Sequence, residues 1–279
     1  MIWRRRHQRL SASLPVADEC STIDKALGRD LLKTGVKVLV TGDPAQLPPV
    51  GGTTFFRAPA YTLTEIHRQA AGSQPLTLAT AIRQGERIAS EPFDIDAAVE
   101  ADVVIASMNR TRRELNHMIR RARGISDKDP VVGDRVVALR NDYKRGVFNG
   151  ELFTIEAVKR GVRLPGSKPP ADMLLRMELV DDIGARVTVV AHDDGFRCTR
   201  LDLHDREYAD LDLLDFGYCL TAHKAQGSEF SNVAVIDETD SPGFQFIAGS
   251  TPLPEFKRRW LYTEIARAKQ QVTVMRAPR

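Results

Sequence analysis

The chain has 279 residues, of which 42% are hydrophobic and 28% are charged, as in an ordinary globular protein. No apolar run approaches the length of a membrane span, which argues against a transmembrane protein. The 40 basic and 37 acidic residues leave a net charge of +3, so any nucleic-acid surface must come from local clustering. The odd number of cysteines and their spacing predict reduced thiols in a cytoplasmic protein; they are Cys20, Cys198 and Cys219.

The first nine residues are basic, and no apolar segment follows them, which excludes a secretory signal. We interpret them as a disordered leader or as read-through from a truncated frame. Residues 14–17 then form a short apolar stretch that ends in Asp18 and Glu19. A helical pattern over 23–31 comes next, with Ser21 or Thr22 as the expected N-cap and Gly35 as the expected terminator.

The strand, the Asp-Glu pair and the helix have the Walker B arrangement. In this arrangement the aspartate holds Mg²⁺, and the glutamate orients and deprotonates an attacking water. An Asp-Glu pair by itself is usually a solvated helix start. The assignment of Asp18 and Glu19 therefore depends on the motifs found later in the chain.

A second apolar run, residues 36–40, predicts a buried strand whose carboxyl end opens into a loop at Gly42. Ligands of open α/β sheets sit outside such strand ends. Asp43 and Gln46 are therefore candidate site residues, and the prolines at 48 and 49 stiffen the loop behind them.

The loop Gly42-Asp43-Pro44-Ala45-Gln46-Leu47-Pro48-Pro49-Val50 resembles the third conserved motif of superfamily 1 helicases. The resemblance implies that Gln46 senses the γ-phosphate of ATP, that Asp43 belongs to the nucleotide site, and that Asp18-Glu19 is the second motif. Residues 61–69 resemble the fourth motif, Leu-Thr-x-x-x-Arg-Gln. This implies that Arg68 contacts the γ-phosphate and that His67 stacks on adenine.

Two later segments resemble the fifth and sixth motifs. The run Thr221-Ala222-His223-Lys224-Ala225-Gln226-Gly227-Ser228-Glu229 implies that Thr221 and His223 face single-stranded DNA, that Gly227 permits close backbone approach, and that Glu229 reaches the ATP ribose. Residues 259–269 resemble the sixth motif, usually Tyr-Thr-Ala-x-Thr-Arg-Ala. The resemblance implies that Arg267 is the second phosphate-sensing arginine. Glu264 replaces the usual alanine of that motif, and Ala266 replaces the usual threonine.

Between these motifs, residues 102–107 predict a buried strand followed by a basic helix. Asn109 and Arg110 lie at the carboxyl end of this strand, where the family places contacts to the DNA backbone. Arg120, Arg121 and Arg123, at the end of the helix, are expected on a solvated face. Residues 91–100 are expected to be an acidic connector.

From 130 to 204 the composition changes to short strands separated by Gly-, Pro- and Asp-rich links, which predicts a small barrel. The strands are expected over 134–140, 152–158, 173–180 and 186–190. The stretch resembles the SH3-like insertion of RecD- and Dda-type helicases. We therefore expect an α/β fold of RecA-like P-loop NTPase motor domains, with an SH3-like β-barrel insertion in the second domain. The first motor domain is expected over residues 1–72, the second over 73–129 and 205–279, and the insertion over 130–204.

The sequence contains no Gly-x-x-x-x-Gly-Lys-[Ser/Thr] loop, which an NTP-driven motor needs to hold phosphates. We therefore expect a RecD/Dda-like DNA helicase truncated at its N-terminus, with a separate chain as a candidate source of the missing motor part. The resemblance implies ATP, Mg²⁺, single-stranded DNA and duplex junctions as ligands. It also implies 5′ to 3′ movement, a monomeric cytoplasmic protein and roles in DNA repair, recombination or replication. The alternative is a catalytically inactive fragment that binds single-stranded DNA.

Overall fold

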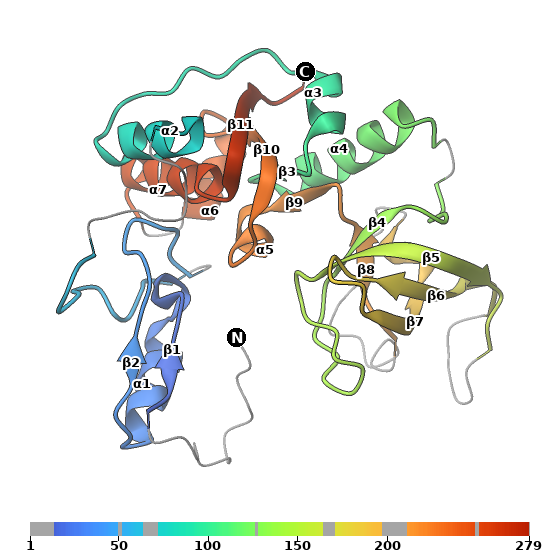
Figure 1. Cartoon of the computed structure of the whole chain (residues 1–279), viewed down its shortest axis with the longest axis horizontal. Coiled ribbons are helices and arrows are strands. Elements are labelled where there is room, and N and C mark those ends of the chain that lie inside the picture. Colours follow the sequence, from blue (N-terminus) through green and yellow to red (C-terminus); the bar gives the residue numbers. More distant parts are fainter. Residues whose placement is uncertain are drawn as a thin grey trace. The chain divides into compact units, whose positions relative to one another are not determined.

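The computed structural model describes residues 14–49, 52–63, 72–125, 128–163, 171–196, 211–248 and 251–278 (Figure 1). The chain divides into two compact units. The first unit comprises Met1–Ser90, Gln226–Ser231 and Asp237–Val272, and the second comprises Glu91–Ala225, Asn232–Ile236 and Thr273–Arg279. None of the helices in the described ranges is long and apolar enough to cross a membrane.

The first unit begins with two short parallel strands, β1 (Val16–Ala17) and β2 (Leu39–Val40), in which Val16 pairs with Leu39. Both strands were expected to be apolar, but the predicted burial of the second one is wrong. Val16 is 61% exposed and Leu39 is 49% exposed. Among the described residues this sheet has two strands.

Helix α1 (Lys25–Lys33) follows β1 after a 3-10 turn at Cys20–Thr22. Its N-cap is Asp24, whose carboxylate accepts a hydrogen bond of 2.8 Å from the Leu27 amide, so the predicted caps Ser21 and Thr22 are wrong. Those two residues belong to the 3-10 turn instead. The terminator is confirmed, since Gly35 has φ +71° directly after the C-cap Thr34.

Three further helices of the first unit pack together: α2 (Gln74–Arg83), α6 (Pro242–Ala248) and α7 (Leu253–Ile265). Trp260 of α7 is 1% exposed, and its ring lies 5.8 Å from that of Phe244 in α6. Phe244 also packs on Phe256, with ring centroids 5.3 Å apart. This aromatic cluster fixes α7, the helix that carries Arg267 at its end.

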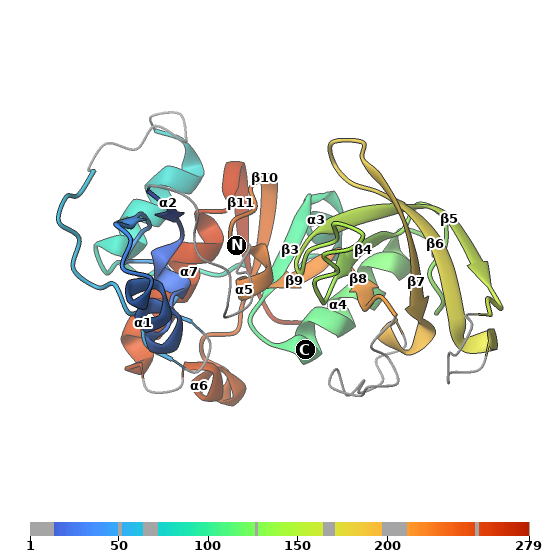
Figure 2. The same ribbon diagram turned by 90° about the horizontal axis from the view of Figure 1, so that it is seen from below.

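A second sheet has the strand order β11-β10-β3-β9, and its strands β3 and β9 lie wholly in the second unit. Its strands are β3 (Val103–Ala106), β9 (Cys219–Thr221), β10 (Phe230–Asp237) and β11 (Ala268–Arg276). All four residues of β3 are fully buried, as expected of a central parallel strand. Helix α4 (Asn109–Ala122) packs on β3 and β9, and the short helix α5 (Ala222–Ala225) follows β9 (Figure 2).

Residues 95–100 of the expected acidic connector form a helix, α3 (Ile95–Glu100), which packs on α4. Asp94 caps it by accepting a 2.9 Å hydrogen bond from the Asp96 amide. Asp94 and Asp96 therefore lie at the helix N-terminus, where the helix dipole favours them, whereas Glu100 is the last residue of the helix. The sequence predicted only an acidic connector here, and the structure shows that six of its residues form a helix.

The remaining strands form an antiparallel sheet of order β7-β6-β5-β4-β8, visible in both views (Figures 1 and 2). The four strands expected from the sequence are confirmed within a few residues, as β4 (Arg135–Ala138), β5 (Leu152–Arg160), β6 (Leu174–Val180) and β7 (Arg186–His192). A fifth, β8 (Leu214–Phe216), pairs with β4 and lies beyond residue 204, where the insertion was expected to end. One core cluster contains side chains from both sheets of this unit.

The expected solvated position of Arg120 is wrong. Arg120 is 1% exposed, and its guanidinium forms two hydrogen bonds, of 2.9 and 2.8 Å, with the carboxylate of Asp134, which is fully buried. Asp134 also accepts hydrogen bonds from the Tyr218 hydroxyl at 2.9 Å and the Val131 amide at 2.8 Å. The arginine is thus buried because a fully hydrogen-bonded counter-ion lies at the start of the antiparallel sheet.

Candidate nucleotide site and nucleic-acid interface

The structure brings the two predicted motifs of the first unit side by side. Asp18 follows β1 directly, and its Oδ1 accepts a hydrogen bond of 2.6 Å from the Thr41 hydroxyl at the end of β2. The Cys20 amide donates to the Thr41 carbonyl at 3.0 Å. Gly42 packs so closely on this turn that a Cβ there would lie 2.6 Å from the Cys20 nitrogen. The carboxyl ends of both strands therefore meet, as open α/β sheets require.

Glu19 has an unusual backbone conformation. Its φ of +52° and ψ of 48° lie in the left-handed region, and no other non-glycine residue among those described has a positive φ. The Thr22 amide and hydroxyl hold the turn by donating to the Glu19 carbonyl at 3.0 and 2.9 Å. Such strain persists only where neighbouring contacts enforce it, and it is concentrated at functional sites.

The loop after β2 is joined to helix α7. The Tyr262 hydroxyl donates to Oδ2 of Asp43, and the Leu47 amide donates to Oγ1 of Thr263 at 2.9 Å. Asp43 also stabilises the loop itself, since its Oδ1 accepts from the Ala45 amide at 2.9 Å. Burial and the bond to Asp43 raise the pKa of Tyr262 above its usual value, so Tyr262 remains a hydrogen-bond donor.

Both predicted phosphate-sensing side chains that the structure describes are buried. Gln46 is 8% exposed, and Arg267 is 1% exposed. Arg267 donates through Nε to the Thr263 carbonyl at 3.1 Å and through Nη1 to the Ser228 carbonyl at 3.4 Å. Within the described residues, Nη2 of Arg267 and Oε1 of Gln46 have no hydrogen-bond partner. Arg68 and His67 lie outside the described residues.

Glu264, the departure from the sixth motif, is fully buried on α7. Burial raises its pKa to about 8, and the nearby Arg267 opposes part of this rise. The sequence marked this position only as an unusual residue. The structure shows its burial. The neighbouring Thr263 joins α7 to the loop of Leu47 through a hydrogen bond.

The other predicted nucleotide contacts of the first unit, Gly227 and Glu229, lie between α5 and β10. Gly227 has φ +80°, a conformation that favours glycine, and nothing lies within 4 Å of the position that a Cβ would take, so its backbone is accessible. Glu229 forms an ion pair with Lys269 at 3.1 Å. A ribose that hydrogen-bonds to Glu229 would therefore approach a carboxylate already neutralised by a lysine.

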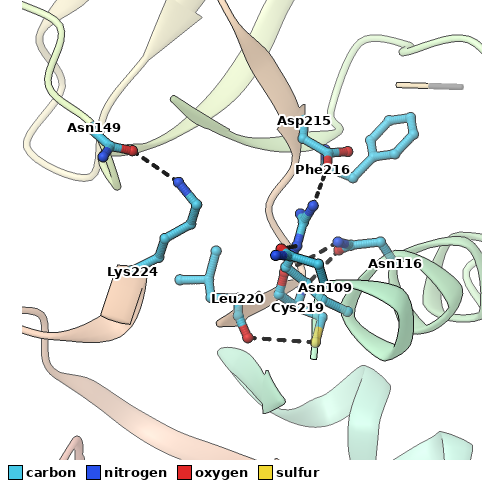
Figure 3. A network of polar contacts seen from close by, with 9 residues as sticks. Asn109, Asn116, Asn149, Asp215, Phe216, Cys219, Leu220 and Lys224 are labelled. Carbon is cyan, nitrogen blue, oxygen red and sulfur yellow. Dashed lines mark hydrogen bonds and ion pairs between the residues drawn. The ribbon is translucent and has the colours of Figure 1, made fainter. Parts of the chain in front are cut away.

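The predicted DNA contacts all lie in the second unit. Asn109 is the first residue of α4, and its Oδ1 accepts from Nε of Arg112 at 3.3 Å. Arg110 is exposed and pairs with Glu114 at 2.9 Å. Thr221 ends β9, and His223 lies on α5. Asn116 fixes this end of the sheet by two hydrogen bonds, of 3.1 and 2.8 Å, with the backbone of Cys219 (Figure 3).

Lys224 is a residue whose role the sequence did not reveal. Its Nζ donates to Oδ1 of Asn149, in the loop between β4 and β5, at 2.9 Å (Figure 3). Burial lowers the pKa of Lys224 to about 8, with a further contribution from Arg112, which is itself paired with Asp215 at 2.6 Å. The neighbouring Asn149-Gly150 dipeptide is a turn signal, but nothing in the sequence points from it to α5.

The carboxylate of Asp18 fits the predicted Mg²⁺ site by its chemistry, since Mg²⁺ prefers oxygen ligands and is usually held by one or two carboxylates beside the substrate phosphates. A second group of ligand-type side chains lies at the end of β7 and in the 3-10 turn that follows it: the ligand atoms of His192, Asp193 and Asp194 lie within 4.8 Å of one another. Arg160 already pairs with Asp193 there at 2.7 Å. The arginine would compete with a cation, so Asp18 remains the better candidate.

The parallel sheet with its helices and the motif loops define the class: an α/β protein with RecA-like motor folds. Residues 216–275 match the UvrD-like helicase C-terminal domain, and residues 3–107 match an AAA domain. The Pif1 helicase from Bacteroides, solved with ADP-AlF3 and single-stranded DNA, is similar over 94% of this chain and 70% of its own (18% identity, TM-score 0.57). The Pif1 helicase from Candida albicans covers 94% and 71% (17% identity, TM-score 0.58). At such identities the likeness shows the fold.

Among curated proteins, the ATP-dependent RecD2 DNA helicase of Deinococcus radiodurans is 26% identical over 95% of this chain and 37% of its own length. The conjugal transfer protein TraA of Agrobacterium fabrum is 26% identical over 74% of the chain and 20% of its own length. The chain thus spans 37% of the length of the first of these relatives and 20% of the length of the second. Together the matches show that the chain is similar to superfamily 1 helicases of the RecD and Pif1 type.

Proposed function

We propose that the chain acts in an ATP-dependent DNA helicase of the RecD/Dda-like type, which couples ATP hydrolysis to 5′ to 3′ translocation on single-stranded DNA and to duplex unwinding. One observation carries the proposal. The loop of Gln46 is hydrogen-bonded to the helix of Arg267 at two points, Tyr262 to Asp43 and Leu47 to Thr263. A displacement of the Gln46 loop at the phosphate would therefore also displace α7. Coupling of ATP hydrolysis to movement requires such a connection.

In the proposed reaction the γ-phosphoryl group of ATP passes to water and ADP leaves; Asp18 would hold Mg²⁺, which would supply positive charge beside the phosphates. Glu19 orients and deprotonates the water. Gln46 senses the γ-phosphate, and Arg267, together with Arg68, stabilises the transition-state charge. The nucleotide is further contacted by Asp43, His67, Gly227 and Glu229.

On the DNA side, we propose backbone contacts from Asn109 and Arg110 at the start of α4 and from Thr221 and His223 after β9. The exposed Arg110 and the half-buried Lys224 supply positive charge at these strand ends. We further propose that the motor domains divide at about residue 72 and that the antiparallel sheet is an SH3-like barrel inserted in the second. We also propose that the protein is a cytoplasmic monomer that acts in DNA repair, recombination or replication.

The test is ATP hydrolysis by the purified 279-residue chain, with and without single-stranded DNA. DNA-stimulated hydrolysis, by this chain or by this chain together with one that supplies the missing phosphate-binding loop, should fall by about 10²–10⁴-fold in Glu19→Gln, because the variant lacks the general base. Glu255→Gln is the matched control, since Glu255 lies on the exposed side of α7 and pairs with Arg259. The variant should hydrolyse ATP like the wild type.

The 279 residues contain no phosphate-binding loop, and this favours one second candidate, a module that binds single-stranded DNA without hydrolysis. Its signature is DNA binding that weakens steeply with salt and does not respond to ATP. Folded protein that shows this behaviour and no hydrolysis would contradict the helicase proposal for this chain. Absence of DNA binding as well would contradict both.

A further inference from the structure

Glu264 is a buried acid that the proposed reaction does not use. It is fully buried, and neither carboxyl oxygen has a hydrogen-bond partner among the described residues. A buried carboxylate in this position would be costly, because no hydrogen bond replaces its lost hydration. The side chain is therefore held as a neutral carboxylic acid.

Arg267 lies three residues after Glu264, in the turn between α7 and β11, and is 1% exposed. Its Nε and Nη1 donate to backbone carbonyls, whereas Nη2 has no acceptor among the described residues. An ionised acid next to a buried guanidinium would normally form an ion pair with it. In this structure the two side chains form none, although Glu264 is within electrostatic range of Arg267.

We propose that Glu264 is a positioning residue for Arg267: as a neutral acid it leaves Nη2 unpaired, and as a carboxylate it captures the guanidinium, so that an anionic ligand can pair with Nη2 only in the first state. This inference rests on the proposed function only in naming the nucleotide phosphate as that ligand. When Glu264 loses its proton, the carboxylate becomes an internal competitor of the phosphate. The phosphate, being anionic, in turn favours the protonated acid.

Other charged groups near this part of the unit are already engaged. Asp43 accepts from the Tyr262 hydroxyl, and Glu229 pairs with Lys269. Arg83 lies over the ring of Tyr262, 6.0 Å from its centroid. Arg267 is therefore the charged group that acts on Glu264, and it favours the ionised form of the acid, which supports the capture.

The first experiment follows the carboxyl group directly. Infrared spectra of the full chain should show a protonated-acid band at pH 7 that disappears as the pH is raised through about 8 and is absent from Glu264→Gln. In Arg267→Met the same band should persist to higher pH, because the guanidinium no longer favours the carboxylate. A band missing at pH 7, or a midpoint that Arg267→Met leaves unchanged, would overturn the proposal.

The second experiment measures the dissociation constant for ATP from pH 6.5 to 9.5. Wild-type affinity should fall above about pH 8, at most about tenfold per pH unit, whereas Glu264→Gln should show no such fall because its amide cannot ionise. Glu264→Met distinguishes packing from charge, since it also lacks the titration, and Glu255→Gln should follow the wild-type profile. A fall of equal steepness in Glu264→Gln would refute the role of Glu264.

The two experiments separate the two proposals. If no variant binds ATP, the proposed function fails for this chain, and the infrared titration still decides whether Glu264 and Arg267 are coupled. If ATP binds and the infrared band is absent, the proposed function stands and the role of Glu264 is wrong.

Discussion

Replacement of Asp134 by alanine tests the account of the buried Arg120 most directly. The substitution removes the acceptor of four hydrogen bonds, two from Arg120 and one each from Tyr218 and Val131. It also leaves the guanidinium buried without its counter-ion. Breaking a buried pair in this way costs about 3–5 kcal/mol. At about 2–4 °C per kcal/mol for a chain of this size, the Tm should fall by about 6–20 °C.

The assay is thermal unfolding at pH 7, followed by circular dichroism. The matched control is Arg110→Ala, which breaks an exposed pair on the same helix and should leave the Tm almost unchanged, because solvent screens such pairs. Replacing both partners with apolar residues, Arg120→Met with Asp134→Leu, should recover part of the loss, since no unpaired charge remains. An Asp134→Ala variant that melts within about 2 °C of the wild type would refute the reasoning.

Three further predictions concern stability. Gly28→Ala should lose about 1–3 kcal/mol in denaturant unfolding, because its Cβ would lie 2.2 Å from the ring of Phe55; adding Phe55→Leu should recover part of it. Wild-type stability relative to Glu264→Gln should fall between pH 4.5 and about 8, by at most about 1.4 kcal/mol per pH unit, because only the folded acid keeps its proton there. Wild-type stability relative to Lys224→Met should rise from about pH 8 to 10.5, because in this range only the unfolded state keeps the amine protonated. Denaturant unfolding curves measured across each pH range test the predicted fall for Glu264 and the predicted rise for Lys224.

Much of the fold could be predicted from local patterns. Strand-type composition between Gly-, Pro- and Asp-rich links placed four strands of the antiparallel sheet, and continuous apolar character placed β3. The strand β8 has three residues, too few for a periodic signal, and it was missed. The burial of Arg120 could not be predicted either, because it depends on Asp134, 14 residues away and beyond the end of the helix.

The site was predicted in its parts but not in its connections. The motifs located the loop of Gln46 and the helix of Arg267 separately. The hydrogen bonds that join them link residues 216 and 219 positions apart, and no local pattern encodes such pairs. The exposure of Leu39 was missed for a related reason, since an apolar run predicts a strand but does not show which neighbours cover it.

The shared core of the second unit has a consequence for how this part of the chain folds and can be engineered. Leu115 and Ile119 of α4 belong to the same buried cluster as Phe153 of β5 and Met177 of β6. The antiparallel sheet is therefore not an appendage that could be excised and replaced by a short linker. Its removal would open the hydrophobic interior beneath α4 to water. We expect β3 and β6 to lose hydrogen-exchange protection together, as one cooperative folding unit.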